Sequence, residues 1–456
     1  MAGKEFDLTP RDVQGVNTPF RKISGKFPVP GSLPVLEGLR RYEPVSMRGQ
    51  PPVVWDRAEG FQVHDAHGNT WIDWSSGVLV TSAGHGRAGI ARAVADQAGR
   101  RLLHNYCFPS EIRFKLVKRL VDLAPEGIDK AFLLTTGSEA TENVIKLGRT
   151  FGSRIDPAKS VVVTFERAFH GRTLGAQLAG GIPELKGWIG ELDPSFVQVP
   201  FPDGFRCKNQ SFDVFEKTLE EKGVPPENVA CVMTETYQGG GASFAPAEYI
   251  RDLRGWCDDN GALLAFDEVQ AGFGRTGKFW GFEHYGVVPD IICCGKAISS
   301  SLPLSAVLGR SDVMDIFAPA TMTSTHTGNP VCCAAALANI DIIEGERLVE
   351  RARETGEVLQ DALHSLGEEY PDVVGAIHGK GLVAGMHMVK PGTEEPDGEL
   401  AFGIVEECVR RGLLMFAPVG FGGATVKISP PLVIPTEAVT EGTEVLAEAM
   451  GAALGR

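Results

Sequence analysis

The feature that most constrains the fold is a series of short, almost entirely apolar runs, each followed at once by polar residues. The runs are Ala131–Thr135, Ser160–Thr164, Ala230–Thr234, Ala262–Phe266, Ile291–Cys294 and Leu304–Leu308. Runs of this length are typical of strands that are covered on both faces. Helical patterns separate them, so the sequence predicts an α/β fold with a mainly parallel sheet.

The residues that directly follow these predicted strands are rich in reactive groups. In an open parallel sheet, ligands bind beyond the carboxyl ends of the strands, so these residues should meet at one edge. A helix start, an aromatic residue, carboxylates and a lysine are all present. They are Gly137 and Ser138, Phe169 and His170, Glu235, Asp267 with Val269 and Gln270, and Lys296.

This combination suits pyridoxal phosphate. A lysine with a partly neutral amine forms a Schiff base with an aldehyde, and a carboxylate that faces a pyridine nitrogen keeps that nitrogen protonated. An aromatic side chain can stack on the ring, and a Gly-Ser helix start binds phosphate through its N–H groups. Taken singly, Lys296 could be a surface lysine and Asp267 a turn cap. Their joint placement after consecutive strands favours the cofactor site.

Other ligand classes have weaker signals. Residues Gly84–Gly89 match GxGxxG, but no acidic residue stands about 20 positions on to take a ribose, so a dinucleotide site is not expected. The nine cysteines form no CxxC and no His/Cys metal spacing, which predicts no metal site and reduced, buried thiols of a cytoplasmic protein.

Composition and charge exclude two further classes. The chain has 44 Lys+Arg against 58 Asp+Glu, a net charge of −14, which disfavours nucleic-acid binding. The longest uncharged segment, Ile316–Ile340, contains prolines, a histidine and several threonines, so we expect no membrane span. Met1–Gly15 carries charges throughout and does not resemble a signal peptide.

Over roughly Pro52–Glu437 the chain resembles the class III (subgroup II) pyridoxal-phosphate-dependent aminotransferases, which have fold type I. The motifs that carry the resemblance stand in the family's order. They are Asp65–Asp73, Gly137–Ala140, Phe169–Gly171, Leu264–Gln270, Gly272–Gly277, Gly295–Ala297, Leu302–Leu304, Thr325–Pro330 and Ser429–Leu432.

The resemblance implies a role for each candidate residue. Lys296 would be linked to the cofactor and would shuttle the proton, and Asp267 would pair with the pyridine nitrogen. The remaining roles concern the ring and phosphate. Gln270 would bind the ring hydroxyl, Val269 and Phe169 would pack on the two ring faces, Gly137 and Ser138 would bind the phosphate, and His170 and Glu235 would support the ring from behind.

The resemblance also implies the organisation of the chain. Residues 83–330 would form the large cofactor-binding domain, while residues 1–82 and 331–456 would together build a small α+β domain. The active unit would be a homodimer with shared sites, in which Thr325 reaches the phosphate of the neighbouring subunit; the sequence leaves dimer and tetramer open. The substrate would be a small-molecule amine.

The sequence departs from the family on the substrate side. The family's usual carboxylate-binding arginines are replaced by Lys427 and Phe416, and a gating glutamate by Gly240. One interpretation is an aminotransferase that moves an amino group from a small primary amine or ω-amino acid to a 2-oxo acid. In this interpretation Lys427, or another cation such as Arg87 or Arg172, binds the carboxylate of the 2-oxo acid. The alternative is a lyase that eliminates ammonia or phosphate from a 2-aminoethyl phosphonate or phosphate, because a lysine suits a tetrahedral anion.

Overall fold

The computed structural model describes residues 4–455, which form two compact units. Unit 1 contains the described residues up to Arg87, the short segment Gly240–Ala242, and the chain from Glu350 onward. Unit 2 contains Ala88–Gly239 and Ser243–Val349. The sequence had placed the second boundary after residue 330. In the structure α10 (Pro330–Gly345) belongs to unit 2, because it packs on α3 (Ala88–Gly99) and α4 (Glu111–Asp122).

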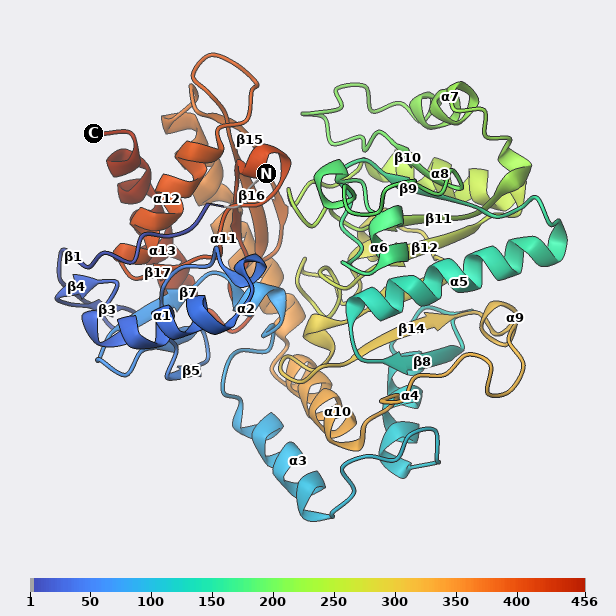
Figure 1. Ribbon diagram of the computed structural model, residues 1–456, viewed down its shortest axis with the longest axis horizontal. Helices are drawn as coiled ribbons and strands as arrows, with labels where there is room; N and C mark the ends of the chain where they lie inside the picture. The colour runs from blue at the N-terminus through green and yellow to red at the C-terminus, as the bar shows by residue number, and fades with distance from the viewer. Residues whose placement is uncertain (1–3, 456) are drawn as a thin grey trace. The chain divides into compact units, whose positions relative to one another are not determined.

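A seven-stranded sheet organises unit 2, in the order β10-β9-β11-β12-β13-β14-β8 (Figure 1). From β10 to β13 neighbouring strands are parallel, whereas β14 runs antiparallel to both β13 and β8. The strands are β8 (Lys130–Leu134), β9 (Val161–Phe165), β10 (Phe196–Val199), β11 (Val229–Glu235), β12 (Leu263–Asp267), β13 (Ile291–Cys294) and β14 (Ser305–Gly309). The predicted α/β class and the six predicted strands are confirmed, while β10 was not foreseen.

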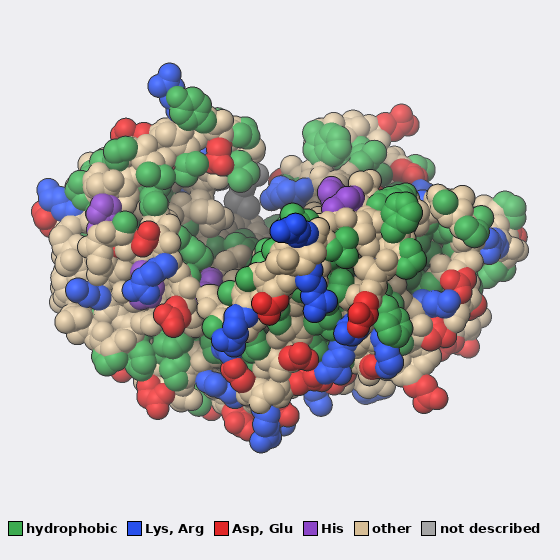
Figure 2. Space-filling view, turned by 90° about the horizontal axis from the view of Figure 1, so that it is seen from below, with side chains coloured by type: hydrophobic (Ala, Val, Ile, Leu, Met, Phe, Trp, Pro, Cys, Tyr) green, Lys and Arg blue, Asp and Glu red, His purple; other side chains and the backbone are tan. Residues whose placement is uncertain are grey.

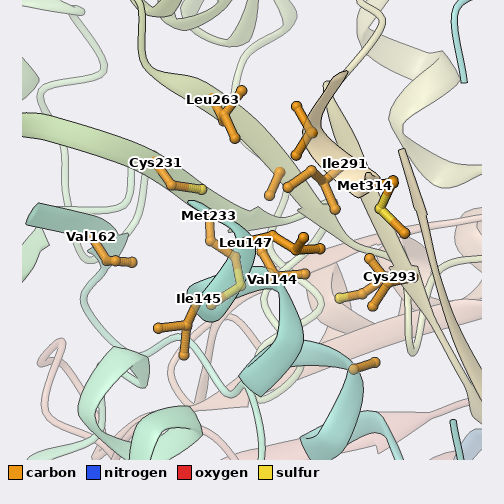
Figure 3. Packing of buried hydrophobic residues seen from close by; sticks show 14 of the residues in the cluster. Val144, Ile145, Leu147, Val162, Cys231, Met233, Leu263, Ile291, Cys293 and Met314 are labelled. Carbon is orange, nitrogen blue, oxygen red and sulfur yellow. The ribbon is translucent and has the colours of Figure 1, made fainter. Parts of the chain in front are cut away.

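Helix α5 (Gly137–Ile155) crosses the sheet and closes the main core of unit 2 (Figure 1). Its Val144, Ile145 and Leu147 point into a cluster with residues of β11 and β13, as Figure 3 shows. The helix approaches β11 so closely that a side chain at Gly152 would collide with Ala230. The other helices of unit 2 are α6 (Leu174–Ala179), α7 (Asp213–Glu221), α8 (Ala247–Asn260) and α9 (Ser311–Met314).

Unit 1 joins the two ends of the chain. Strand β17 (Leu413–Leu414) pairs in parallel with β7 (Thr70–Asp73), and Trp71 Nε1 donates to the Val409 carbonyl at 2.9 Å. The other strands of this sheet are β2 (Val16–Asn17), β3 (Lys22–Ile23), β5 (Arg57–Glu59) and β6 (Gln62–His64). N-terminal and C-terminal residues thus share one sheet.

Unit 1 also contains a separate antiparallel sheet of β15 (Val374–Lys380), β16 (Val383–Met388) and β18 (Thr425–Ile428). A short ribbon pairs β1 (Arg11–Asp12) with β4 (Lys26–Phe27). The helices are α1 (Leu33–Tyr42), α2 (Ser76–Leu79), α11 (Leu348–Glu369, mostly in this unit), α12 (Gly398–Arg410) and α13 (Thr436–Ala453).

The charges on the surface and the hydropathy of the helices bear on the expectations about nucleic acid and membranes. Figure 2 shows Lys and Arg side chains interspersed with Asp and Glu side chains over the face in view. Among residues 4–455, no helix is both long enough and apolar enough to cross a membrane.

Candidate active site

The structure brings the unit 2 candidates together at one edge of the sheet. Strands β9, β11, β12 and β13 are parallel and all end there. Strand β8 also ends there, because β14 is antiparallel to both β13 and β8, which makes β8 parallel to β13. Glu235 and Asp267 are the last residues of their strands and lie side by side in the register of β11 and β12. Phe169 and His170 follow β9, Lys296 follows β13, and Gly137 and Ser138 follow β8.

Asp267 is held in a fixed orientation by neighbours that donate to both of its oxygens. The carboxylate is only 5% exposed. Oδ2 is paired with His170 Nδ1 at 2.8 Å, and Oδ1 accepts from the Val269 backbone N–H at 3.1 Å. Burial lowers the pKa of His170, but the hydrogen bond and charge of Asp267 outweigh it, so the net shift is upward. The shift favours the protonated imidazole, which is the form that stabilises a neighbouring carboxylate.

Glu235 ties two loops to this pair. Its two oxygens accept hydrogen bonds from the backbone N–H of Phe169 at 3.0 Å and of Gly239 at 2.8 Å. Burial raises the pKa of this carboxyl to about 7, against the lowering effect of His170. The position of the Phe169 ring therefore depends on Glu235.

Glu268 was not singled out by the sequence analysis, yet it fixes the segment after β12. It is fully buried, accepts from the backbone N–H of Gly281 at 2.6 Å, and is hydrogen-bonded to the Thr236 hydroxyl. Burial raises the pKa of this carboxyl to about 7. The sequence signal for this role is the position of Glu268 beside Asp267. A carboxylate after a strand does not reveal that backbone N–H groups from η5 (Gly281–Tyr285) will donate to it.

Lys296 begins a short 3₁₀ turn, η6 (Lys296–Ile298), with a backbone φ of +44°. A left-handed conformation at a residue with a side chain is uncommon and is often found at functional sites. Burial lowers the pKa of the Lys296 amine, and the charges of Asp267 and Glu235 only partly oppose this effect. A lowered pKa increases the fraction of neutral amine, which is the nucleophilic form.

The start of α5 has the properties of an anion site. Thr136 caps the helix by accepting from the Glu139 N–H, and Glu139 in turn accepts from the backbone N–H of Thr135 and Thr136. The N–H groups of Gly137 and Ser138 lie in the first turn, where no carbonyl of the helix can accept them. These N–H groups and the helix dipole are available to an anionic group.

These features fit pyridoxal phosphate. The free N–H groups at Gly137 and Ser138 match its phosphate, the oriented Asp267 matches its ring nitrogen, and Lys296 matches its aldehyde. A side chain at Gly137 would lie 2.9 Å from Val269 Cγ1, so glycine keeps Val269 close to the helix start. Within residues 4–455, no group of three or more His, Cys, Asp or Glu side chains is placed to hold a metal ion.

The other predicted site residues are divided between the two units. Phe169 and Gln270 are half-buried in unit 2, and the Gln270 amide lies against Gly239. Thr325 is exposed on a loop of unit 2. Lys427 on β18 and Phe416 after β17 belong to unit 1, where they are 2% and 5% exposed.

Arg172 is placed with the unit 2 cluster. Its backbone N–H donates to Ser138 Oγ at 3.2 Å, and its guanidinium carbon lies 5.7 Å from the centre of the Phe169 ring. This distance is typical of a cation–π contact. Arg172 thus contacts two of the predicted cofactor-binding residues, Ser138 through its backbone and Phe169 through its exposed guanidinium.

The fold and this site define a pyridoxal-phosphate-dependent enzyme of fold type I. A family model described as "Aminotransferase class-III" matches residues 45–450. A probable 4-aminobutyrate aminotransferase of Bacillus subtilis (strain 168) is 34% identical over 406 residues, covering 86% of this chain and 91% of that protein. An isoleucine 2-epimerase of Lentilactobacillus buchneri is 33% identical, covering 88% and 90%.

A solved Bacillus anthracis aminotransferase superposes with a TM-score of 0.84 and 30% identity, covering 93% of this chain and 99% of that one. The chain belongs to the class III aminotransferase family. The predicted family, fold type, aminotransferase activity and cofactor are thereby confirmed. The names of these relatives give the lyase interpretation no support.

The titration of Glu235 generates a prediction for the protein without bound cofactor. Its folded-state pKa of about 7 lies above the ordinary value of 4.5, so the folded state binds more protons than the unfolded state between these values. The stabilisation that this proton contributes to the folded state is complete below pH 4.5 and is lost as the pH rises through 7. Glu235→Gln should reduce the fall of unfolding free energy across this window by up to about 1.4 kcal/mol per pH unit, the contribution of one proton.

Denaturant unfolding curves measured at several pH values from 5 to 7 would check this slope. Glu221→Gln, which changes an exposed carboxyl at the end of α7, is the matched control. A slope in Glu235→Gln equal to that of the unmodified protein would contradict the assignment.

Proposed function

We propose that this enzyme transfers an amino group from a small primary amine or ω-amino acid to a 2-oxo acid. The observation that carries the proposal is the joint placement of a lysine with a lowered pKa, an oriented carboxylate and an anion-binding helix start at one sheet edge. The relative named for 4-aminobutyrate supports an ω-amino acid as donor.

The residues would divide the chemistry as follows. Pyridoxal phosphate, when bound, supplies an aldehyde that condenses with amines and a ring that takes up an electron pair. Lys296 would hold the aldehyde end of the cofactor through Nζ, and its amine would carry the proton that leaves the substrate. Asp267, oriented by His170, would hold the ring N–H. Val269 and Phe169 would hold the ring between them, Gln270 would bind its hydroxyl, and the N–H groups of Gly137 and Ser138 would bind the phosphate.

We propose that basic side chains recognise the substrate. A 2-oxo acid presents a planar carboxylate, which the fork of a guanidinium matches in a bidentate way. Arg172 carries such a group beside Phe169, so we propose that it binds the carboxylate of the acceptor. Lys427 and Phe416 of unit 1 stay proposed substrate-binding residues, Lys427 through its charge and Phe416 through apolar contact.

The working form is proposed to be a homodimer whose sites include Thr325 of the neighbouring copy. The Thr325 loop lies against residues 102–108, since Tyr106 donates to Thr323 Oγ1 at 3.3 Å and the His104 and His326 rings are 5.3 Å apart. Large apolar side chains surround this contact on the surface: Leu103 is 55%, Phe108 73% and Phe114 64% exposed. A second copy would cover this apolar patch and receive Thr325. Pairing of such dimers into a tetramer is also compatible with this surface.

We further propose that the enzyme works in the cytoplasm. All nine cysteines are free thiols, and Cys231, Cys257 and Cys408 are among those buried. Burial raises the pKa of these three thiols well above the ordinary value. Unpaired thiols are typical of a reducing compartment.

The proposed reaction predicts a stall when one substrate is withheld. With a primary amine and no 2-oxo acid, the holoenzyme should convert one equivalent of amine per site and stop, because the amino group stays on the enzyme. Adding a 2-oxo acid should restart turnover. Product analysis and the cofactor spectrum would follow both stages, and continued release of ammonia or phosphate without acceptor would contradict amino transfer.

Replacing the proposed linkage residue should change the cofactor spectrum. Lys296→Ala should abolish the visible absorbance of a lysine-linked cofactor and reduce activity by several orders of magnitude, because both the linkage and the proton carrier are lost. Lys186→Ala is the matched control, since Lys186 is also buried but donates to the Leu178 carbonyl and to Gln198. An unchanged spectrum in Lys296→Ala would refute the assignment.

The apolar patch predicts a change of oligomeric state. Phe108→Asp should convert the dimer into a monomer, because it places a charge where apolar surface would be covered. Light scattering after gel filtration would measure the mass. The control is Ile155→Asp, which should remain dimeric. Ile155 lies at the end of α5, and its side chain is likewise exposed, at 61%.

A further inference from the structure

Three polar side chains at the start of α5 face the loop of residues 166–173, which joins β9 to α6. Ser138, Thr141 and Glu142 are spaced i, i+3 and i+4, so they lie on one side of the helix. Helix α5 also packs on α6, the short helix to which this loop leads. One side of α5 thus carries the proposed phosphate-binding residue Ser138 and two further polar side chains next to it.

Thr141 holds the loop at His170. Its side chain is fully buried, and its hydroxyl donates to the His170 carbonyl at 2.7 Å, with a longer contact of 3.0 Å to the Ser138 carbonyl. A buried carbonyl needs a donor, and His170 lies outside both β9 and α6. Thr141 therefore fixes the backbone of the residue whose ring orients Asp267.

Glu142 holds the loop at its other end. Its Oε1 accepts from the Thr173 hydroxyl at 2.6 Å and from the backbone N–H groups of Gly175 at 2.8 Å and Ala176 at 3.2 Å. Thr173 is the N-cap residue of α6 but makes no side-chain cap, so Glu142 caps α6 from the neighbouring helix. One carboxylate oxygen thus binds three donors of the loop and of the helix that follows.

Between these two anchors the loop contacts Ser138 itself. The Arg172 backbone N–H donates to Ser138 Oγ at 3.2 Å. Gly171 has a backbone φ of +132°, and a side chain there would lie 2.3 Å from the same oxygen. A serine hydroxyl has one proton and two lone pairs, so an oxygen that accepts from Arg172 can give its proton to another acceptor. The loop thereby orients the Ser138 hydroxyl as a donor.

We propose that Thr141, Glu142 and Gly171 are positioning residues for the cofactor phosphate. Thr141 and Glu142 hold the loop on either side of Gly171, and the missing side chain of Gly171 lets the Arg172 N–H reach Ser138. The Ser138 hydroxyl then donates to a phosphate oxygen, in addition to the N–H groups of the helix start. This inference concerns the retention of the cofactor and holds for any amine substrate.

The test compares pyridoxal 5′-phosphate with pyridoxal, which lacks the phosphate. Each is titrated into the full chain after removal of bound cofactor, and the ratio of the two dissociation constants measures the contribution of the phosphate. We expect Glu142→Leu, which removes the acceptor of three donors, to reduce this ratio by at least about tenfold, the size of a hydrogen bond to a charged group. Glu142→Gln keeps an acceptor oxygen and should retain most of the ratio.

Two further variants act on the same hydroxyl by other routes. Thr141→Val removes the donor to His170 at nearly constant volume, and Gly171→Ala places a methyl group against Ser138 Oγ. Both should reduce the ratio by at least about tenfold, while the affinity for pyridoxal stays nearly unchanged. Gly255→Ala is the matched control, because a side chain at this exposed glycine of α8 would meet nothing within 4 Å.

A second measurement uses the holoenzyme. The rate at which the cofactor is lost after dilution into phosphate-free buffer is followed by absorbance. This rate should rise at least about tenfold in Thr141→Val and Gly171→Ala, and it should stay near the value of the unmodified enzyme in Glu142→Gln and Gly255→Ala. The melting temperature of each cofactor-free variant identifies any that does not fold.

A purely structural role predicts a different result. If any folded variant among Glu142→Leu, Thr141→Val and Gly171→Ala weakens both ligands equally, or leaves the ratio unchanged, the inference is overturned. If Glu142→Leu does not fold, the other two variants decide the outcome. If the unmodified protein binds both ligands equally well, the assignment of the phosphate to Gly137 and Ser138 fails, and this inference fails with it.

Discussion

The hydrogen bond between His170 and Asp267 is the interaction on which the site depends. It joins the loop after β9 to the end of β12 across the intervening strand β11, and both side chains are almost fully buried. An ionised carboxylate at this depth is stable only with a charged or hydrogen-bonded partner. Glu235 at the end of β11 completes the row by binding the backbone of Phe169. One sheet edge thus orients the acid, the imidazole and the aromatic ring together.

The same burial has opposite effects on the groups of this edge. Removal from water disfavours charge, so it raises the pKa of Glu235 and Glu268 and lowers that of Lys296. Asp267 is oriented by its contact with His170, whose pKa is raised, whereas the lowered pKa of Lys296 favours the neutral, nucleophilic amine. A single desolvated environment therefore produces both the electrostatic anchor and the reactive amine that pyridoxal phosphate chemistry needs.

The sequence by itself determined the class of fold and the strands whose ends meet at this edge, and it predicted Lys296, Asp267, Gly137 and Ser138 as site residues. These follow from local patterns, since a buried strand and a helix start are each encoded in a few consecutive residues. It did not reveal β10, the inclusion of α10 in unit 2, or the role of Glu268. Only the tertiary structure decided these points, because the packing of α10 on α3 joins segments far apart in the chain, and the return of η5 to Glu268 is not encoded by the residues next to Glu268.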